Sequence, residues 1–335
     1  MKILIIGNGF DLAHSLPTTY NNFLDVCDGI ISEDTPNPLF NKNYRDFCDT
    51  VSKIEHSIFK SLVNNNSWIE HFRNNRKHLG DKWGDFESEI EYVVKEYNKQ
   101  MEINGKNKSV VSTFSKISHT LRNKYPEYNN TYNQLFTYLS LELKQLTSAL
   151  DMYFHFYIDK KEIVLNDMFL TKDIDKCLSF NYSSTYVSKY PAYDVDDFEC
   201  CYIHGESTKN NIVLGFDDHY LITEQTHIKT VPFEKYYQRI IKSTDNKYIR
   251  WLDEINQNKI STELIVFGHS LTPADGDVLV KFFSCPYIKT IIYYVNQDDL
   301  AEKVANLAVV LGPDKLIELA GGLDPIIKFL PIKEL

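Results

Sequence analysis

The chain has 335 residues, enough for a large α/β domain with an insertion or for two domains. Its 46 acidic residues outnumber its 36 basic ones, and no run of five basic residues occurs, so a surface that tracks nucleic-acid phosphates is not expected. No segment approaches the roughly 20 apolar residues of a membrane span, and the short apolar start does not have the pattern of a secretory signal.

The six cysteines indicate neither a zinc module nor a disulfide framework. No two of them have the two-residue gap that structural zinc sites commonly use, so no metal is predicted. Several fall in apolar runs, where a free thiol packs as a small hydrophobic side chain. We therefore expect a protein of the reducing cytoplasm. The cysteines are Cys27, Cys48, Cys177, Cys200, Cys201 and Cys285.

The first element is a short apolar run at residues 3–6, which ends at Gly7. Such a run is typical of a buried parallel strand, and ligands of open α/β sheets bind outside the carboxyl ends of the strands. Residues 16–27 follow with helical spacing and Pro17 near their start, which predicts a helix. The turn between the two elements is therefore a candidate functional segment.

A long helical segment then interrupts the strand pattern. From about residue 44 to residue 157 the chain is polar and aromatic, with apolar residues at helical spacing. We predict a helical insertion, or lid, over residues 41–169. Residues 1–40 and 170–335 are predicted to form a nucleotide-binding core.

Five more strand-like runs follow the first, at residues 176–181, 199–204, 211–215, 263–268 and 290–296. They end at Asn181, His204, Gly215, Gly268 and Asn296. Because the carboxyl ends of parallel strands share one edge of a sheet, these distant residues are expected to converge on one crevice. The sequence thus predicts an α/β fold with a doubly wound, mostly parallel, Rossmann-like sheet and a large helical insertion.

The first turn carries the residues Gly7, Asn8, Gly9, Phe10 and Asp11. Its glycines would let backbone N–H groups approach a nucleotide phosphate at the positive end of the next helix. Glycine also serves strand-to-helix geometry alone, and the third glycine of the dinucleotide fingerprint is missing, so both interpretations stay open. Because a carboxylate repels phosphate, we assign Asp11 to ribose hydroxyls or to capping of the helix.

The second strand end carries Asn181, followed by Ser183 and Ser184. The two serines are predicted to cap the following helix. The Asn181 amide can both donate and accept, which suits it to fix a water molecule or a ribose hydroxyl. A structural role in a turn explains the same residue equally well.

Two later strand ends carry histidines. We favour His204 as a general base, because imidazole titrates near neutral pH and the residue lies at the predicted sheet edge. After another strand, Gly268 and Ser270 are predicted to line the ligand crevice, with His269 as a secondary candidate. Asp275, further along this turn, is predicted to cap the next helix.

Five stretches carry a family resemblance: residues 7–20, 83–87, 180–182, 203–205 and 267–271. They resemble the bacteriophage abortive-infection AbiH family, and the resemblance spans nearly the whole chain. It implies a role in phage defence without defining a reaction.

The order of these motifs also looks like that of sirtuin-type NAD-binding domains, which cleave the nicotinamide glycosidic bond. The similarity implies a sirtuin-like sheet with NAD as the substrate. By motif, Gly7 and Gly9 would approach the phosphates. Asn181 would hold the attacking water or the ribose, and His204 would act as the base.

The same similarity implies that Gly268 and Ser270 contact the adenosine side and that Asn296 holds the adenine ribose. This chain departs from the sirtuin pattern at Asn8 and Phe10, where the sirtuin turn has a small residue. It also lacks the paired-cysteine zinc module that binds acyl-lysine peptides. Protein deacylation is therefore not expected, and NAD hydrolysis is the activity that the resemblance leaves.

The main hypothesis is an abortive-infection effector that binds and hydrolyses NAD. One alternative is a nucleotide-binding sensor, or a partner-binding module, without catalysis. A second is a metal-dependent nuclease that uses Asp11, Glu87 and His204, which the acidic balance of the chain disfavours. The partners considered are a nucleotide, a phage-derived or protein trigger and a second copy of the chain, whereas nucleic acid and membranes are not expected.

Overall fold

The computed structural model describes residues 1–79, 83–105, 109, 115–166, 169, 173–190, 198–217 and 229–332. The chain forms two compact units. Unit 1 comprises residues 1–16, 161–206 and 244–335, and unit 2 comprises residues 17–160 and 207–243. The predicted boundaries placed residues 17–40 and 207–243 in the nucleotide-binding core, whereas the structure groups both segments in unit 2.

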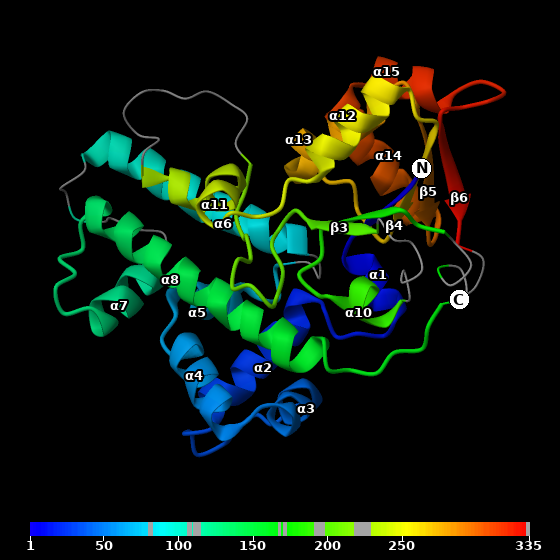
Figure 1. Ribbon diagram of the computed structural model, residues 1–335. Helices are drawn as coiled ribbons and strands as arrows, with labels where there is room; N and C mark the ends of the chain where they lie inside the picture. The colour runs from blue at the N-terminus through cyan, green and yellow to red at the C-terminus, as the bar shows by residue number, and fades with distance from the viewer. Residues whose placement is uncertain are drawn as a thin grey trace. The chain divides into compact units, whose positions relative to one another are not determined.

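Unit 1 is built on one sheet of six parallel strands in the order β3-β2-β1-β4-β5-β6 (Figure 1). The strands are β1 (Lys2–Ile6), β2 (Lys176–Ser179), β3 (Glu199–Tyr202), β4 (Thr262–Phe267), β5 (Ile288–Tyr294) and β6 (Ile327–Pro331). The direction in which strands are added reverses between β1 and β4, which is where doubly wound folds bind their ligands. The predicted Rossmann-like α/β architecture is confirmed.

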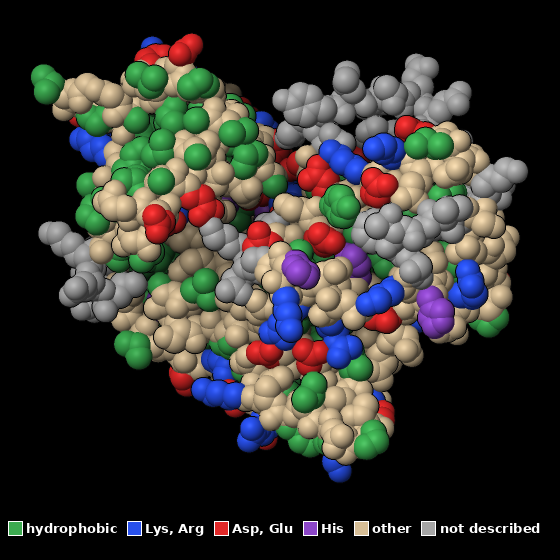
Figure 2. Space-filling model, turned by 180° about the vertical axis from the view of Figure 1, so that it is seen from behind, with side chains coloured by type: hydrophobic (Ala, Val, Ile, Leu, Met, Phe, Trp, Pro, Cys, Tyr) green, Lys and Arg blue, Asp and Glu red, His purple; other side chains and the backbone are tan. Residues whose placement is uncertain are grey.

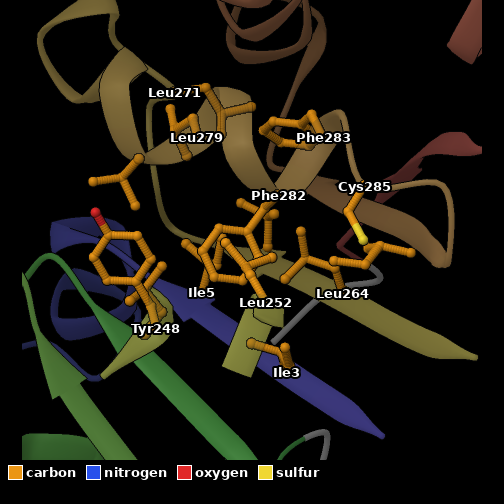
Figure 3. Close-up of a cluster of buried hydrophobic side chains, with 14 of the residues drawn as sticks. Ile3, Ile5, Tyr248, Leu252, Leu264, Leu271, Leu279, Phe282, Phe283 and Cys285 are labelled. Atoms are coloured by element: carbon orange, nitrogen blue, oxygen red, sulfur yellow. The ribbon is translucent and has the colours of Figure 1, made fainter. Parts of the chain in front are cut away.

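Helices cover both faces of this sheet. The helices of unit 1 are α1 (Asn8–Ala13), α10 (Thr185–Lys189), α12 (Tyr248–Asn258), α13 (Gly276–Phe283), α14 (Gln297–Leu311) and α15 (Pro313–Ala320). Ile3 and Ile5 pack on one face with apolar residues of α12 to α15, among them Phe282 (Figure 3). Leu4 and Ile6 pack on the other face among the aromatic rings of α1 and α10. Burial on both faces explains why β1 is an unbroken apolar run.

Two strand predictions need correction. Residues 211–215 form no strand and belong to unit 2, so Gly215 does not lie at the sheet edge. A Cβ at Gly215 would lie 2.1 Å from the carbonyl oxygen of Phe233, so close backbone packing explains this glycine. The sequence analysis also missed β6, which pairs with β5 at the end of the sheet. Lys328 interrupts the apolar pattern of that strand.

Helices form most of the regular structure in the described part of unit 2. They are α2 (Tyr20–Ser32), α3 (Lys42–Thr50), α4 (Lys53–Val63), α5 (Ser67–Asn75), α6 (Trp83–Asn104), α7 (Ser115–Lys124), α8 (Tyr132–Tyr153), the π-helix η1 (Phe154–Ile158), the 3-10 helix η3 (Val231–Phe233) and α11 (Lys235–Ile241). The predicted helix at residues 16–27 begins later, because Thr19 and Asn22 form a capping box that starts α2 at Tyr20.

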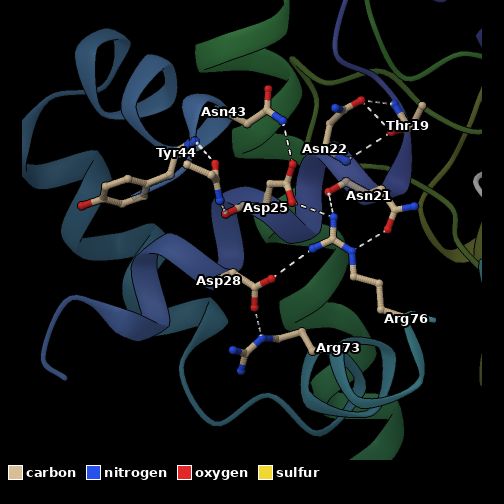
Figure 4. A network of polar contacts seen from close by, with 10 residues as sticks. Thr19, Asn21, Asn22, Asp25, Asp28, Asn43, Tyr44, Arg73 and Arg76 are labelled. Atoms are coloured by element: carbon tan, nitrogen blue, oxygen red, sulfur yellow. Dashed lines mark hydrogen bonds and ion pairs between the residues drawn. The ribbon is translucent and has the colours of Figure 1, made fainter. Parts of the chain in front are cut away.

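An ionic network ties α2 to its neighbours in unit 2 (Figure 4). Arg76, after α5, lies 2.6 Å from Asp25 and 3.1 Å from Asp28, which Arg73 also contacts. Asn43 of α3 donates to the second oxygen of Asp25 at 2.9 Å. Single pairs of partly exposed charges stabilise little, but this network fixes three helices through two carboxylates.

Hydrophobic side chains gather on the outer surface of the C-terminal helices of unit 1 (Figure 2). Val309, Ile317 and Leu323 are among the exposed ones. Apolar side chains scattered over a surface are normal in globular proteins. Among the residues that the structure describes, no helix has the length and apolar character needed to span a bilayer.

Candidate functional site

Four polar residues occupy one level of the sheet edge in unit 1. The last paired positions of β1, β2, β3 and β4, residues 6, 179, 202 and 267, are in register with one another. Two residues beyond them, in the same order, stand Asn8, Asn181, His204 and His269. Four distant parts of the chain thus meet at the carboxyl ends of adjacent strands, where open α/β sheets bind ligands.

A shared carboxylate joins the two histidines. Asp275 ends the 3-10 helix η4 (Pro273–Asp275), and its Oδ1 lies 2.8 Å from Nε2 of His204. Its Oδ2 lies 3.3 Å from Nε2 of His269. Nδ1 of His269 accepts the backbone N–H of Leu271 at 2.9 Å, so the proton of this ring sits on Nε2. Asp275 thus accepts from Nε2 of His204 and lies close to Nε2 of His269, so the basic nitrogen of His204 is Nδ1.

The role of Asp275 corrects the sequence analysis, which predicted only a helix cap. The residue does precede α13, but its side chain makes no capping hydrogen bond. A proline-led turn followed by an acidic residue has the signature of an ordinary helix start, so the sequence offers no local signal for this contact. The strand order places the ends of β3 and β4 at one edge of the sheet, with β2 and β1 between them, and the side-chain contact itself appears only in the structure.

The loop that carries His269 has a left-handed backbone at one residue, and side chains of α14 donate hydrogen bonds to its carbonyl oxygens. Leu271 adopts φ +58°, a left-handed conformation that costs a non-glycine residue about 1 kcal/mol or more. From α14, Lys303 donates to the carbonyl oxygen of His269 and Asn306 to that of Ser270, each at 2.9 Å. Such strain persists only where the surroundings impose it, and it concentrates at functional sites.

Asn181 is a buried amide whose side chain has no hydrogen-bond partner among the residues that the structure describes. Its side chain is only 4 % exposed, and neither Oδ1 nor Nδ2 contacts a donor or acceptor within hydrogen-bond distance. Its backbone N–H is satisfied by Oγ of Ser179 at 3.2 Å. An unmet buried polar group costs about 1–3 kcal/mol, so this amide gains from a ligand that both donates and accepts.

Asp11 ties the first two strand ends together. It is fully buried, and Ser183 donates to its Oδ2 at 2.6 Å. Thr185 in turn donates to Oγ of Ser183 at 3.1 Å. Neither Ser183 nor Ser184 caps α10, because Ser183 bonds Asp11 and the N-cap Ser184 makes no side-chain capping bond. The predicted serine caps are therefore wrong, and the assignment of Asp11 to a ribose stays a prediction.

Backbone packing explains the glycines of the two turns. A Cβ at Gly7 would lie 2.7 Å from Cα of His269, and one at Gly9 would lie 2.7 Å from Cα of Gly268. Gly268 itself has φ +66°. The N–H of Gly9 is donated to the carbonyl oxygen of Gly268 at 2.8 Å, and that of Phe10 to Gly7 at 2.8 Å. These two amides are thus engaged within the turns, and a phosphate contact at Gly7, Gly9 and Gly268 stays a prediction.

The remaining residues predicted to contact a ligand differ in whether their side chains are exposed or already hydrogen-bonded. The ring of Phe10 is fully buried among other aromatic rings. Asn296 caps α14, and its Oδ1 accepts the N–H of Asp299 at 2.9 Å. Asn8 and Ser270 are partly exposed at the sheet edge. Asn8 and Ser270 are therefore the side chains of this group best placed to meet a ligand.

The residues suggested for a nuclease are divided between the two units of the chain. Glu87 of α6 lies in unit 2, where its carboxylate pairs with Nζ of Lys235 at 3.0 Å. Asp11 and His204 belong to unit 1. The carboxylate, imidazole and amide groups at the sheet edge instead suit proton transfer and hydrogen bonding to a polar ligand.

Comparison with known proteins gives one match. The family model described as Bacteriophage abortive infection AbiH matches residues 3–295. No curated protein and no solved structure matches the chain. The matched region contains Asn181, the two histidines and Asp275, so the residues gathered at the sheet edge all belong to the part that defines the family.

Proposed function

The chain belongs to the bacteriophage abortive infection AbiH family, and we propose that it acts in phage defence by hydrolysing NAD at the nicotinamide glycosidic bond. The family match accounts for the role in phage defence. The proposed reaction takes place at the sheet edge of unit 1. The observation that carries the proposal is the side-chain amide of Asn181, which is buried and has no partner among the described residues. Asn181 follows β2, and His204 follows the neighbouring strand β3.

The proposed reaction needs water at C1′ of the nicotinamide ribose. The water oxygen forms a bond to C1′ while the C1′–N1 bond breaks, and nicotinamide leaves as a neutral molecule with the bonding electron pair. Nδ1 of His204 takes the proton of the water, and Asp275 stabilises the imidazolium that forms. The products are nicotinamide, ADP-ribose and one proton.

Asn181 suits the remaining demands of this reaction. Its oxygen can accept from the attacking water or from a ribose hydroxyl, and its N–H₂ group can donate to the second ribose hydroxyl. Positive charge develops on the ribose as the bond breaks, so dipoles fixed before the reaction lower its barrier. A buried amide that lacks internal partners is available for this purpose.

The test is incubation of the purified chain with NAD while free nicotinamide and ADP-ribose are followed by chromatography. We compare Asn181→Ala and His204→Gln with the control His71→Gln, which removes another buried histidine, one that pairs with Glu89 in unit 2. The two site variants should lose activity by at least about 100-fold. The control should retain it.

The same variants are tested in cells that are challenged with phage, with NAD content and plaque number as readouts. NAD should fall after infection only with the wild type and with His71→Gln. Binding of NAD in calorimetry without turnover, in the purified chain and in infected cells, would favour the sensor alternative. Neither binding nor turnover would reject the proposal.

A further inference from the structure

A second cluster of chemically reactive side chains lies in unit 2, where α2 ends beside α3 and α4. Glu33 is the residue after α2, Cys48 belongs to α3 and His56 belongs to α4. One ligand atom from each, a carboxylate oxygen, the thiol sulfur and an imidazole nitrogen, lies within 4.8 Å of the other two. None of these residues takes part in the sheet edge of unit 1.

Hydrogen bonds hold the Glu33 carboxylate at the centre of this cluster. Its Oε1 lies 2.7 Å from Nε2 of His56 and accepts from the hydroxyl of Tyr44 at 2.9 Å. Its Oε2 pairs with Nζ of Lys60 at 2.9 Å. The side chain of Glu33 is 15 % exposed and that of His56 is 27 % exposed, so both side chains are partly open to solvent.

We propose that Glu33, Cys48 and His56 bind one zinc ion, with water as the fourth ligand. Zinc takes sulfur, nitrogen and oxygen ligands at about 2.0–2.3 Å, which separates neighbouring ligand atoms in a tetrahedron by about 3.3–3.7 Å. In the structure the three ligand atoms lie within 4.8 Å of one another, with no cation between them, and side-chain rotations would bring them to these separations. A thiolate and an imidazole exclude magnesium and calcium, which prefer oxygen ligands.

The charges of the cluster fit a divalent ion. The carboxylate of Glu33 and the thiolate of Cys48 together balance the two positive charges of zinc. Lys60 remains paired with Oε2 of Glu33 and also with Asp34 at 2.8 Å, so its ammonium group is neutralised at the rim. Oε1 of Glu33 is the oxygen that faces His56, and it is therefore the one that turns to the metal.

Zinc binding changes the protonation of two ligands. The thiol proton of Cys48 is released to solvent, and the proton that Nε2 of His56 shares with Glu33 moves to Nδ1, so that the ring binds the metal as a neutral imidazole. The bound ion joins three helices that are otherwise linked there by hydrogen bonds.

The sequence analysis predicted no metal because it looked for paired cysteines. This site uses one cysteine, and its three ligands come from three separate helices. A single cysteine, histidine and glutamate at these spacings carry no recognisable motif. Their proximity appears only after α2, α3 and α4 have packed.

The experiment uses the full chain, treated with a chelator and then dialysed. Zinc is titrated by calorimetry in competition with a chelator of known affinity, and cobalt is titrated separately by absorption spectroscopy. We expect one zinc per chain. We also expect a cobalt spectrum with a thiolate-to-metal charge-transfer band and the intense visible bands of a tetrahedral site.

Two substitutions test the ligands, and one serves as control. Cys48→Ser and His56→Gln should each weaken zinc binding by more than the roughly 10- to 100-fold that loss of an outer-shell partner costs. Cys200→Ser replaces another half-buried free cysteine, in unit 1, and should leave affinity unchanged. Should Cys48→Ser fail to fold, His56→Gln, which alters a partly exposed side chain, carries the test.

Three results would overturn the proposal. They are the absence of one-to-one zinc binding, equal affinity in the wild type and both ligand variants, and a cobalt spectrum without the thiolate band.

Discussion

His204 and Asp275 form a buried pair, with Nε2 of the ring 2.8 Å from Oδ1 of the carboxylate. The pair joins the end of β3 to the loop after β4, although β2 and β1 lie between these strands in the sheet. The second carboxylate oxygen reaches His269. A carboxylate on one ring nitrogen fixes the tautomer and increases the basicity of the other, which is the arrangement that a general base requires.

Replacing Asp275 with Asn tests this orientation. The amide keeps the size of the side chain but removes its charge, so it stabilises neither the productive tautomer nor the imidazolium of His204. On the proposed function, NAD hydrolysis should fall by about 100- to 10,000-fold. Nicotinamide release measures the loss, and circular dichroism checks the fold. Full activity in Asp275→Asn would show that the pair has no catalytic role.

Replacing Asn181 with Leu should separate stability from function. The leucine side chain is similar in volume to that of asparagine and has no polar atom that needs a hydrogen bond. The free energy of unfolding should therefore increase by about 1 kcal/mol. Denaturant titration measures this gain. The same variant should lose the stabilisation that NAD confers on the wild type. A less stable variant would mean that the amide has a partner in the folded chain.

Several parts of the fold were predictable because they depend on local patterns. The apolar run at residues 3–6 and the strand ends at Asn181 and His204 indicated a parallel sheet, which the structure has. Residues 211–215 show the same pattern without forming a strand, because a short apolar run fits a buried loop equally well. The β6 strand was missed because Lys328 breaks its pattern.

The contacts within the site were less predictable than its residues. His204 and Asn181 stand at strand ends, so their position follows from the parallel sheet. Asp275 contacts His204 because β3 and β4 end at the same edge of the sheet and the loop after β4 has a left-handed backbone at Leu271, and neither feature leaves a sequence signal. Close backbone packing explains Gly9 without a ligand, so the phosphate contact inferred for it stays a prediction.

Replacing Gly268 with Ala should destabilise unit 1 strongly. The new Cβ would lie 2.2 Å from the backbone nitrogen of Phe10 at a φ of +66°, and backbone atoms cannot move aside. The free energy of unfolding should fall by about 3 kcal/mol or more. Gly276→Ala is the control, because its Cβ would meet only Val310 at 3.6 Å and alanine favours helix. Equal stability of the two variants would contradict the packing of the turns.

Replacing Asp151 of α8 with Asn should stabilise the chain at neutral pH. Burial, reinforced by the charge of Asp159, raises the pKa of the Asp151 carboxyl from 3.8 to about 7. Between pH 3.8 and about pH 7 the carboxyl keeps its proton in the folded chain but has lost it in the unfolded chain. The free energy of unfolding therefore decreases as pH rises through this range, and above about pH 7 the whole destabilisation by the buried charge is present.

Asparagine keeps an oxygen that can accept the backbone N–H of Asn210 but carries no charge, so Asp151→Asn should gain about 1 kcal/mol at pH 8 after solvent screening is discounted. It should gain much less at pH 3.5, where the carboxyl is protonated in the folded chain and mostly protonated in the unfolded chain. Denaturant titrations at the two pH values measure the difference. Asp324→Asn is the control, because hydrogen bonds from Lys289 and Lys328 lower the pKa of that exposed carboxyl, so its removal brings no gain at pH 8. An equal gain at both pH values would show that the benefit of Asp151→Asn does not come from the buried charge.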